Sequence, residues 1–176
     1  ELYQPFAPEL AVDNQRAMAL MERLNATPAA DGEGRAALLR ELLGAIGDGS
    51  EVRPPFYCDY GIYITIGIGT FVNFGAVMLD VAPITIGNDV QVGPNVQLLT
   101  PTHPLDSEPR REKWEAAEPI TIGNNVWLGG GAIVCPGVTI GDNTVVGAGA
   151  VVVKDLPPNV LAVGTPARVV RQIVSS

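Results

Sequence analysis

The one histidine of the chain, His103, stands in a short segment whose residues are suited to proton transfer. The segment reads Thr100-Pro-Thr-His-Pro-Leu-Asp, and its two prolines restrict the backbone around the imidazole. An imidazole ordinarily takes up and releases a proton near neutral pH, so His103 is a candidate general base. The alternative for this residue alone is an ordinary surface histidine in a loop. Which of the two applies depends on the elements that position it.

Composition narrows the classes of protein to consider. The chain has 176 residues, of which 47% are hydrophobic and 17% charged, as in a globular domain. A net charge of −8 argues against nucleic-acid binding, which needs a basic patch. No apolar run approaches the roughly 20 residues of a membrane span, and no signal for secretion is present. We expect a cytoplasmic protein without nucleic-acid or membrane partners, and with Cys58 and Cys135 as reduced structural thiols.

A six-residue period runs through most of the chain. An aliphatic residue recurs at every sixth position and is usually followed by glycine, and a small or β-branched residue stands four positions after it. The period holds in three blocks, with a shift of two residues between the first and the second. Its aliphatic positions are Ile66, Val72, Met78, Ile84, Ile86, Val92, Leu98, Ile122, Leu128, Val134, Ile140, Val146 and Val152.

This period fits neither an amphipathic helix, which repeats every 3.6 residues, nor a hairpin meander. It fits a short strand and a turn, with one aliphatic side chain pointing inward on each of three faces. Three faces close one triangular coil, and stacked coils bury a continuous core. The sequence therefore predicts a mainly β protein with a parallel β-helix over residues 52–165.

The remaining segments lack the six-residue period. We expect an N-terminal helical segment over residues 1–51, with an apolar stripe from Leu10 to Leu24 and a second helix at about 35–46. A polar loop at about 99–119 interrupts the coils and carries His103, and long loops in compact folds tend to be functional. Residues 166–176 form an amphipathic tail for which we predict a short helix.

Several segments resemble the maltose, galactoside and nodulation O-acetyltransferases of the hexapeptide-repeat family, over essentially the whole chain. They are Glu1-Leu-Tyr, Pro54-Pro-Phe-Tyr-Cys-Asp-Tyr-Gly, Asn73-Phe, Leu79-Asp-Val, Thr102-His-Pro-Leu-Asp, Ile122-Gly-Asn-Asn-Val-Trp-Leu-Gly-Gly-Gly and Gly164-Thr-Pro-Ala-Arg. The CDYG and LDV segments are most similar to the maltose type. The resemblance implies a left-handed β-helix, a homotrimer with active sites between subunits, and acetyl-CoA as the co-substrate.

The resemblance also implies roles for individual residues. His103 would deprotonate a sugar hydroxyl, which attacks the thioester directly, and the backbone N–H of Gly130 would bind the oxyanion. Asn73, Asp80 and Asp59 match acceptor-site positions, although each is also explained as a corner, solvated or turn residue. For the coenzyme, the corresponding positions are Trp127, Gly129, Ala148, Gly149, Lys154, Arg168 and Arg171. Trp127 is equally explained by packing, and each cation by solvation.

No metal is expected in the site. The three-histidine zinc centre of β-helical carbonic anhydrases needs three histidines, and a trimer of this chain supplies one from each subunit for a single axial site. Two alternatives stay open. One is a related acetyltransferase that acts on serine or a xenobiotic. The other is a non-catalytic β-helix scaffold, such as an ice-binding protein; that function needs a threonine ladder, whereas outward positions such as Asn124 and Asp142 are mixed.

Overall fold

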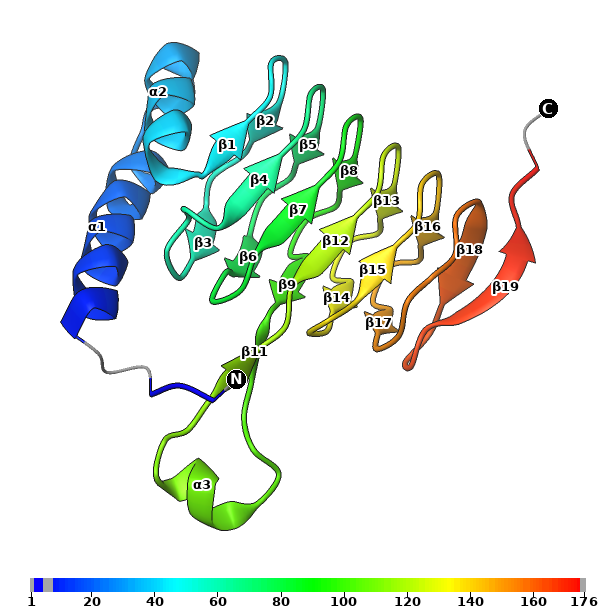
Figure 1. Cartoon of the computed structure of the whole chain (residues 1–176). Coiled ribbons are helices and arrows are strands. Elements are labelled where there is room, and N and C mark those ends of the chain that lie inside the picture. The colour runs from blue at the N-terminus through cyan, green and yellow to red at the C-terminus, as the bar shows by residue number, and fades with distance from the viewer. Residues whose placement is uncertain (1, 5–7, 175–176) are drawn as a thin grey trace.

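A computed structural model describes residues 2–4 and 8–174 of the chain. Three parallel sheets of five, seven and five strands form the faces of a solenoid, so the predicted β-helix is confirmed. The seventh strand of the middle sheet is a final antiparallel one. Figure 1 shows the coils stacked side by side, from the helices at one end to the C-terminal strands at the other. None of the helices in the described ranges has the length and apolarity to cross a membrane.

The periodic aliphatic residues build the core of the solenoid, as predicted. All thirteen positions of the six-residue period named above are at most 2% exposed. Residues at equivalent positions of successive coils are paired in register, as in the columns Ile66–Ile86–Ile122–Ile140 and Val72–Val92–Leu128–Val146. Each coil therefore buries its aliphatic side chains against those of its neighbours, and no coil has a core of its own.

The three faces take their strands in turn along the chain. The first face contains β1 (Ala45–Ile46), β4 (Ile64–Ile66), β7 (Ile84–Ile86), β12 (Ile120–Ile122) and β15 (Thr139–Ile140). The second contains β2 (Glu51–Val52), β5 (Phe71–Val72), β8 (Gln91–Val92), β13 (Trp127–Leu128), β16 (Val145–Val146), β18 (Val160–Val163) and β19 (Arg168–Gln172). The third contains β3 (Phe56–Cys58), β6 (Ala76–Leu79), β9 (Gln97–Leu99), β14 (Ile133–Val134) and β17 (Val151–Val152).

Turns between the faces form three edges that run the length of the solenoid. We call the edge between the second and third faces the glycine edge, because Gly75, Gly131 and Gly149 adopt positive φ there. The edge between the third and first faces is the histidine edge, since the segment with His103 leaves the solenoid at this edge. The asparagine edge lies between the first and second faces, where side chains such as Asp142 accept hydrogen bonds from the adjacent coil.

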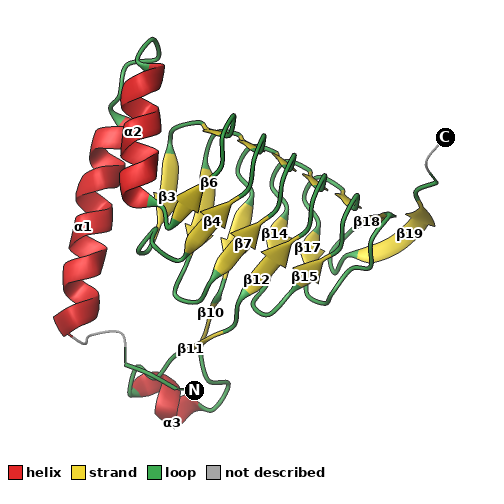
Figure 2. Ribbon diagram, turned by 45° about the horizontal axis from the view of Figure 1, so that its top comes forward, coloured by secondary structure: helices red, strands yellow, loops and turns green. Residues whose placement is uncertain are grey.

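Two helices close the N-terminal end of the solenoid (Figure 2). Helix α1 (Pro8–Asn25) buries the predicted stripe from Ala17 to Leu24, whereas Leu10 at its start is half-buried, and Met21 contacts the first coil. Helix α2 (Gly32–Leu42) begins at its N-cap Asp31. It ends four residues before the predicted end, because Ala45 and Ile46 already pair with β4. The predicted start of the β-helix at residue 52 therefore lies inside the first coil.

The interruption at about 99–119 is an ordered arm. Strands β10 (Pro101–Thr102) and β11 (Ala116–Ala117) pair antiparallel at its base, and the short helix α3 (Ser107–Arg111) lies at its tip. The chain re-enters the stack in register, because β12 pairs with β7 of the preceding coil. The arm is therefore an insertion that leaves the stacking of the coils intact.

The C-terminal tail is a strand, so the predicted short helix is wrong. After a turn at Gly164, β19 pairs antiparallel with β18 along the last coil. The β-branched residues Val169 and Val170 favour a strand, and the open edge of β18 offers backbone groups that a helix would leave unpaired. This strand closes the C-terminal end of the solenoid, as the helices close the other end.

A column of exposed threonines runs along the first face. Thr65, Thr85, Thr121 and Thr139 occupy aligned positions of β4, β7, β12 and β15. Our expectation that the outward positions are mixed is therefore wrong for this face, because in each strand the threonine between two buried aliphatic residues points outward. The mixed residues, such as Asn124, lie on the asparagine edge instead.

One pair of substitutions in β12 tests the role of the columns. Replacing Ile122 by Ala removes a buried side chain from its column, and we expect this to lower the free energy of unfolding by about 2–5 kcal/mol. The adjacent Thr121→Ala variant changes an exposed position, and its effect should stay within about 0.5 kcal/mol. Denaturant titration at one protein concentration measures both. Equal losses in the two variants would contradict the column as the source of stability.

Candidate active site

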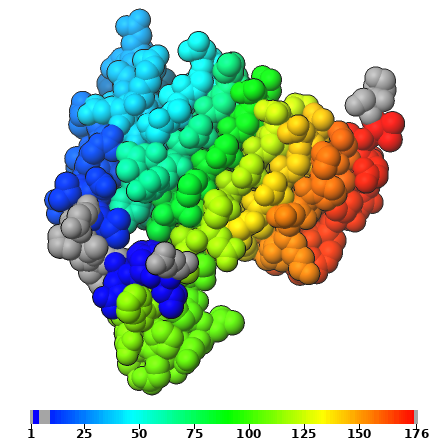
Figure 3. Space-filling view, in the orientation of Figure 1, coloured from blue at the N-terminus to red at the C-terminus, as the bar shows by residue number. Residues whose placement is uncertain are grey.

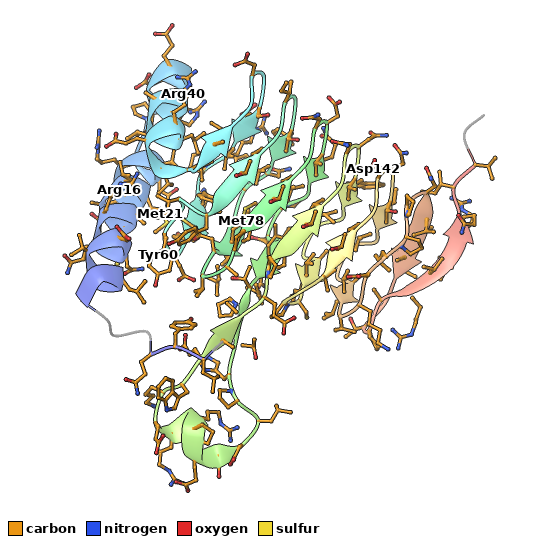
Figure 4. The ribbon with its side chains drawn as sticks, in the orientation of Figure 1. Arg16, Met21, Arg40, Tyr60, Met78 and Asp142 are labelled. Carbon is orange, nitrogen blue, oxygen red and sulfur yellow. The ribbon has the colours of Figure 1, made fainter. Side chains whose placement is uncertain are left out.

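A cavity of about 550 Å³ lies at the histidine edge, between α1, the turn after β3 and the base of the arm. Its lining includes Asp59, Tyr60 and His103, together with Tyr3 and Glu115. Figure 4 shows Tyr60 between α1 and the first coils. The side chain of His103 is 58% exposed, and its Nδ1 lies 3.8 Å from Oε1 of Glu115. The Nε2 atom, on the far side of the ring, is thus available to exchange a proton with a bound molecule.

Asp59 contributes a carboxyl group to the same cavity. Burial, together with the smaller effects of the carboxylates of Asp80 and Glu115, raises its pKa from an ordinary 3.8 to about 6. The backbone carbonyl of Asp59 accepts a hydrogen bond from the side chain of Asn14, which fixes the turn against α1. A half-buried carboxyl group beside a histidine is suited to accept hydrogen bonds from hydroxyl groups.

Asp80 supports the turn that lines this cavity. Its side chain is completely buried, and its two oxygens accept hydrogen bonds from the backbone N–H groups of Asp59, Tyr60 and Tyr63. Burial raises the pKa of Asp80, although the bonds to backbone amides lower it. The contact of Asp80 with the acceptor stays a prediction, and its burial gives it a structural role as well. Its carboxylate holds the turn that presents Asp59.

Two cavity residues have no role in the sequence reading, namely Tyr3 and Glu115. The hydroxyl of Tyr3 donates a 2.8 Å hydrogen bond to Oε2 of Glu115. Tyr3 lies in the Glu1-Leu-Tyr segment, which carries the family resemblance, but nothing in the sequence links it to residue 115. The signal that connects them is the fold of the arm, which places Glu115 opposite the start of the chain.

Asn73 and Gly130 lie on a different edge of the solenoid, the glycine edge. The side-chain oxygen of Asn73 accepts a hydrogen bond from the N–H of Phe74, which leaves its amide nitrogen free to donate. No acceptor for the N–H of Gly130 occurs among residues 2–4 and 8–174. A Cβ atom at Gly130 would meet Pro94 at 3.4 Å, an ordinary contact, so a side chain also fits at this position.

Packing and backbone conformation explain the other small residues of the glycine edge. A Cβ atom at Gly129 would lie 2.5 Å from the backbone nitrogen of Ala148 in the next coil. Gly129 is therefore buried, and the packing of the coils requires a glycine at this position. Gly149 adopts a φ of +68°, which glycine tolerates, and open space surrounds the position of its Cβ. Ala148 and Gly149 thus leave the outer surface of this edge unobstructed.

The remaining coenzyme candidates are spread over the surface. The side chain of Trp127 lies on the second face between Gln91 and Val145, and the residue is 55% exposed. Arg168 and Arg171 are exposed on β19, beyond the last turn of the glycine edge. Lys154 is exposed on the histidine edge. Lys154 thus lies on a different edge from the two arginines of β19.

The candidate residues thus divide between two edges of one solenoid. His103 and Asp59 share a cavity on the histidine edge, whereas Asn73 and Gly130 lie on the glycine edge. The third face separates these edges along its whole length. A single chain therefore holds two incomplete groups of polar residues, one with a base and one with backbone and amide donors.

A hexapeptide solenoid with a histidine on an inserted arm defines the class of hexapeptide-repeat transferases, and comparisons with known proteins agree. The maltose acetyltransferase hexapeptide capping motif matches residues 1–47, and the six-repeat bacterial transferase hexapeptide model matches residues 119–154. Nodulation protein L of Rhizobium meliloti is 49% identical over 96% of this chain and 92% of its own length. The chain belongs to the maltose, galactoside and nodulation group of hexapeptide-repeat O-acetyltransferases, and it is an acyltransferase.

Solved structures place the whole chain in the same family. A maltose O-acetyltransferase from Clostridium difficile 630 superposes with a TM-score of 0.98 at 42% identity, covering 99% of this chain and 94% of the other. A galactoside acetyltransferase in complex with coenzyme A superposes with a TM-score of 0.97 at 41% identity, covering 99% and 87%. The helical cap, the arm and the final strand are therefore within the aligned region.

The raised pKa of Asp59 leads to a pH-dependent effect on stability. Between pH 3.8 and about 6 the folded protein binds more protons at this group than the unfolded chain, so its contribution to stability falls as the pH rises. At neutral pH we expect Asp59→Asn to raise the free energy of unfolding by an amount on the order of 1 kcal/mol, after allowing for partial solvation. The gain should vanish below about pH 4.

Thermal melts of wild type and Asp59→Asn across this pH range measure the effect. The matched control is Asp142→Asn, which changes a carboxylate on the distant asparagine edge. A stability difference for Asp59→Asn that is independent of pH, or that grows at low pH, would contradict the burial of this carboxyl group.

Proposed function

We propose that the protein transfers the acetyl group of acetyl-CoA to a hydroxyl of a sugar, with His103 as the general base. The observation that carries this proposal is the position of His103 on the rim of the 550 Å³ cavity, with Nδ1 toward a carboxylate and Nε2 free. The names of the maltose and galactoside acetyltransferases support a sugar acceptor. The match of the N-terminal capping motif also favours this group over relatives that act on serine or antibiotics.

The reaction proceeds by direct attack. Nε2 of His103 takes the proton of the acceptor hydroxyl, while the hydroxyl oxygen forms a bond to the thioester carbonyl carbon. The negative charge that develops on the carbonyl oxygen needs a preorganised donor, and the free N–H of Gly130 has this capacity. When the tetrahedral intermediate collapses, the C–S bond breaks, and the CoA sulfur receives the proton from the imidazolium. The products are an acetyl ester and CoA.

The division of the site between two edges supports a homotrimer with shared active sites. A threefold ring of such prisms brings the histidine edge of one subunit against the glycine edge of the next. His103 and Asp59 then meet Asn73 and Gly130 of the neighbouring subunit. Asp59 and Asn73 have complementary capacities, since a carboxylate accepts hydrogen bonds and an amide nitrogen donates them.

The same ring gives the exposed coenzyme candidates a common surface. Trp127, Ala148 and Gly149 lie on or beside the glycine edge, where they would border the pantetheine arm. Arg168 and Arg171 extend from the end of this edge and supply charge for the phosphates, and Lys154 joins them from the histidine edge of the neighbour. Val153 has no side-chain hydroxyl, so this position cannot add a side-chain hydrogen bond to the coenzyme. Two free cysteines and acetyl-CoA as the donor fit a cytoplasmic enzyme that needs no metal.

The test is release of free thiol from acetyl-CoA in the presence of glucose, maltose, a galactoside, glucosamine, serine or chloramphenicol. We expect release with at least one sugar, and we expect His103→Ala to lower kcat by about 10²–10⁴-fold. Coenzyme binding and assembly should be unchanged in the variant, because His103 lies on the arm and outside the hydrophobic core of the solenoid. Asn124→Ala, on the remote asparagine edge, serves as the matched control and should keep full activity.

Other outcomes separate the alternatives. Release with serine or chloramphenicol alone would reject the sugar acceptor and assign the protein to a neighbouring branch. Full activity of the His103→Ala variant would reject this histidine as the base. A protein that binds no CoA would contradict the acetyltransferase mechanism and favour the scaffold, for which the threonine column of the first face is one available surface.

A further inference from the structure

Glu115 and His103 occupy opposed positions at the base of the arm. The antiparallel register of β10 and β11 pairs Pro101 with Ala117 and Thr102 with Ala116, so the next opposed pair is His103 and Glu115. Side chains of directly opposed residues in an antiparallel pair lie on the same face. The 3.8 Å separation of Nδ1 and Oε1 follows from this register. The contact is therefore built by the arm itself and needs no other element.

The other oxygen of Glu115 is held by the start of the chain. Tyr3 and Glu115 exchange two backbone hydrogen bonds of 2.8 and 2.9 Å, and the Tyr3 hydroxyl donates to Oε2 at 2.8 Å. Burial and the adjacent Glu115 raise the pKa of Tyr3, so the hydroxyl keeps its proton at neutral pH. Figure 3 shows the N-terminal residues, in dark blue, packed on the arm. The side chain of Glu115 is only 19% exposed as a result.

Other carboxylates on the arm are engaged elsewhere. Asp106 caps α3 by accepting a hydrogen bond from the N–H of Glu108, and Glu108 forms an ion pair with Arg111. Glu112 accepts a hydrogen bond from the indole of Trp114. Within the described part of the chain, Glu115 is the carboxylate that lies within 4 Å of the imidazole.

We propose that Glu115 is the positioning residue for His103, and that Tyr3 fixes Glu115, so that the first residues of the chain belong to the catalytic apparatus. The proposal rests on the proposed function, in which His103 is the base. A carboxylate facing Nδ1 favours the tautomer with a proton on Nδ1, and this leaves the lone pair of Nε2 to accept the proton of the substrate. The same negative charge stabilises the imidazolium that forms during transfer. The separation of 3.8 Å is longer than a hydrogen bond, and such contacts tighten when the substrate binds.

The presence of a single histidine allows a direct test. The protein is labelled with ¹⁵N at histidine only, and its nitrogen NMR spectrum is recorded at alkaline pH, where an imidazole is neutral. Because the chain has one histidine, the ring signals report the tautomer of His103 without a separate resonance assignment. We expect the Nδ1–H form to predominate in the wild type and to lose its predominance in Glu115→Ala. In the acetyl-transfer assay, Glu115→Ala should lower kcat at least about tenfold and leave the KM for acetyl-CoA within a factor of about two.

Two further variants complete the test. Tyr3→Phe removes one hydroxyl and should shift the tautomer and kcat in the same direction by a smaller factor, so it gives the answer even where Glu115→Ala fails to assemble. Glu22→Ala removes an exposed carboxylate from α1 and should change neither measurement. An unchanged tautomer in both Glu115→Ala and Tyr3→Phe, or a kcat of Glu115→Ala within a factor of about two of wild type, would overturn the proposal.

The two readouts also separate this proposal from the function on which it rests. If the wild type transfers no acetyl group to any acceptor, the proposed function fails. The NMR spectrum then still decides the arrangement, because the effect of Glu115 on the tautomer of His103 is measured without turnover.

Discussion

The register between stacked coils is the constraint on which the rest of the structure depends. Each strand donates and accepts hydrogen bonds with the coil before and the coil after it, and each aliphatic side chain fills a place in a buried column. The prism that results is rigid, because no coil can rotate without breaking the columns on both sides. Residues on different edges of one chain therefore stay apart. This property, rather than any single side chain, requires that a site with contributions from two edges be completed by a second subunit.

The same constraint explains where chemistry can be added. The interior of the prism is filled with aliphatic side chains, so functional groups must stand on edges and insertions. The arm is inserted at one turn of the histidine edge and carries His103. The stack of coils continues beyond the arm because β12 pairs with β7. The turn that presents Asp59 is held by the buried carboxylate of Asp80, which accepts three backbone hydrogen bonds. Rigid elements thus position both groups of the cavity, as precise catalysis requires.

The sequence predicts those parts of the fold that repeat. Every aliphatic residue at the sixth position of the repeat is buried, because burial on the inner side of a coil is a local consequence of the pattern. The sequence does not predict where the repeat starts or how it ends. Ala45 and Ile46 form a strand because β4 offers a partner, and β19 forms because β18 has an open edge. The handedness of the coil likewise came from the family resemblance and from no periodicity.

Site residues were predictable to the extent that a local motif marks them. His103 stands out as the sole histidine in a loop, whereas Glu115 and Tyr3 are ordinary residue types in segments without a period. Their roles depend on the antiparallel register of the arm and on the return of the chain start to it, and both are tertiary features. Asp80 and Gly129 show the converse case, in which a position matched by resemblance also has a structural role. The family resemblance implied contact with ligands for both residues, and the structure adds a role in packing for each, since Asp80 is buried and a Cβ atom at Gly129 would meet the next coil.

Complementation between two inactive variants tests most directly whether the site is shared between subunits. His103→Ala removes a side chain from the histidine edge, and Asn73→Ala removes one from the glycine edge. The two variant proteins are mixed, unfolded and allowed to reassemble together. If each site combines one edge from each of two neighbours, about a quarter of the sites in random trimers contain both intact edges, and activity returns to about that fraction of wild type. An activity no greater than the sum of the separate variants, or full activity of Asn73→Ala alone, would contradict the account.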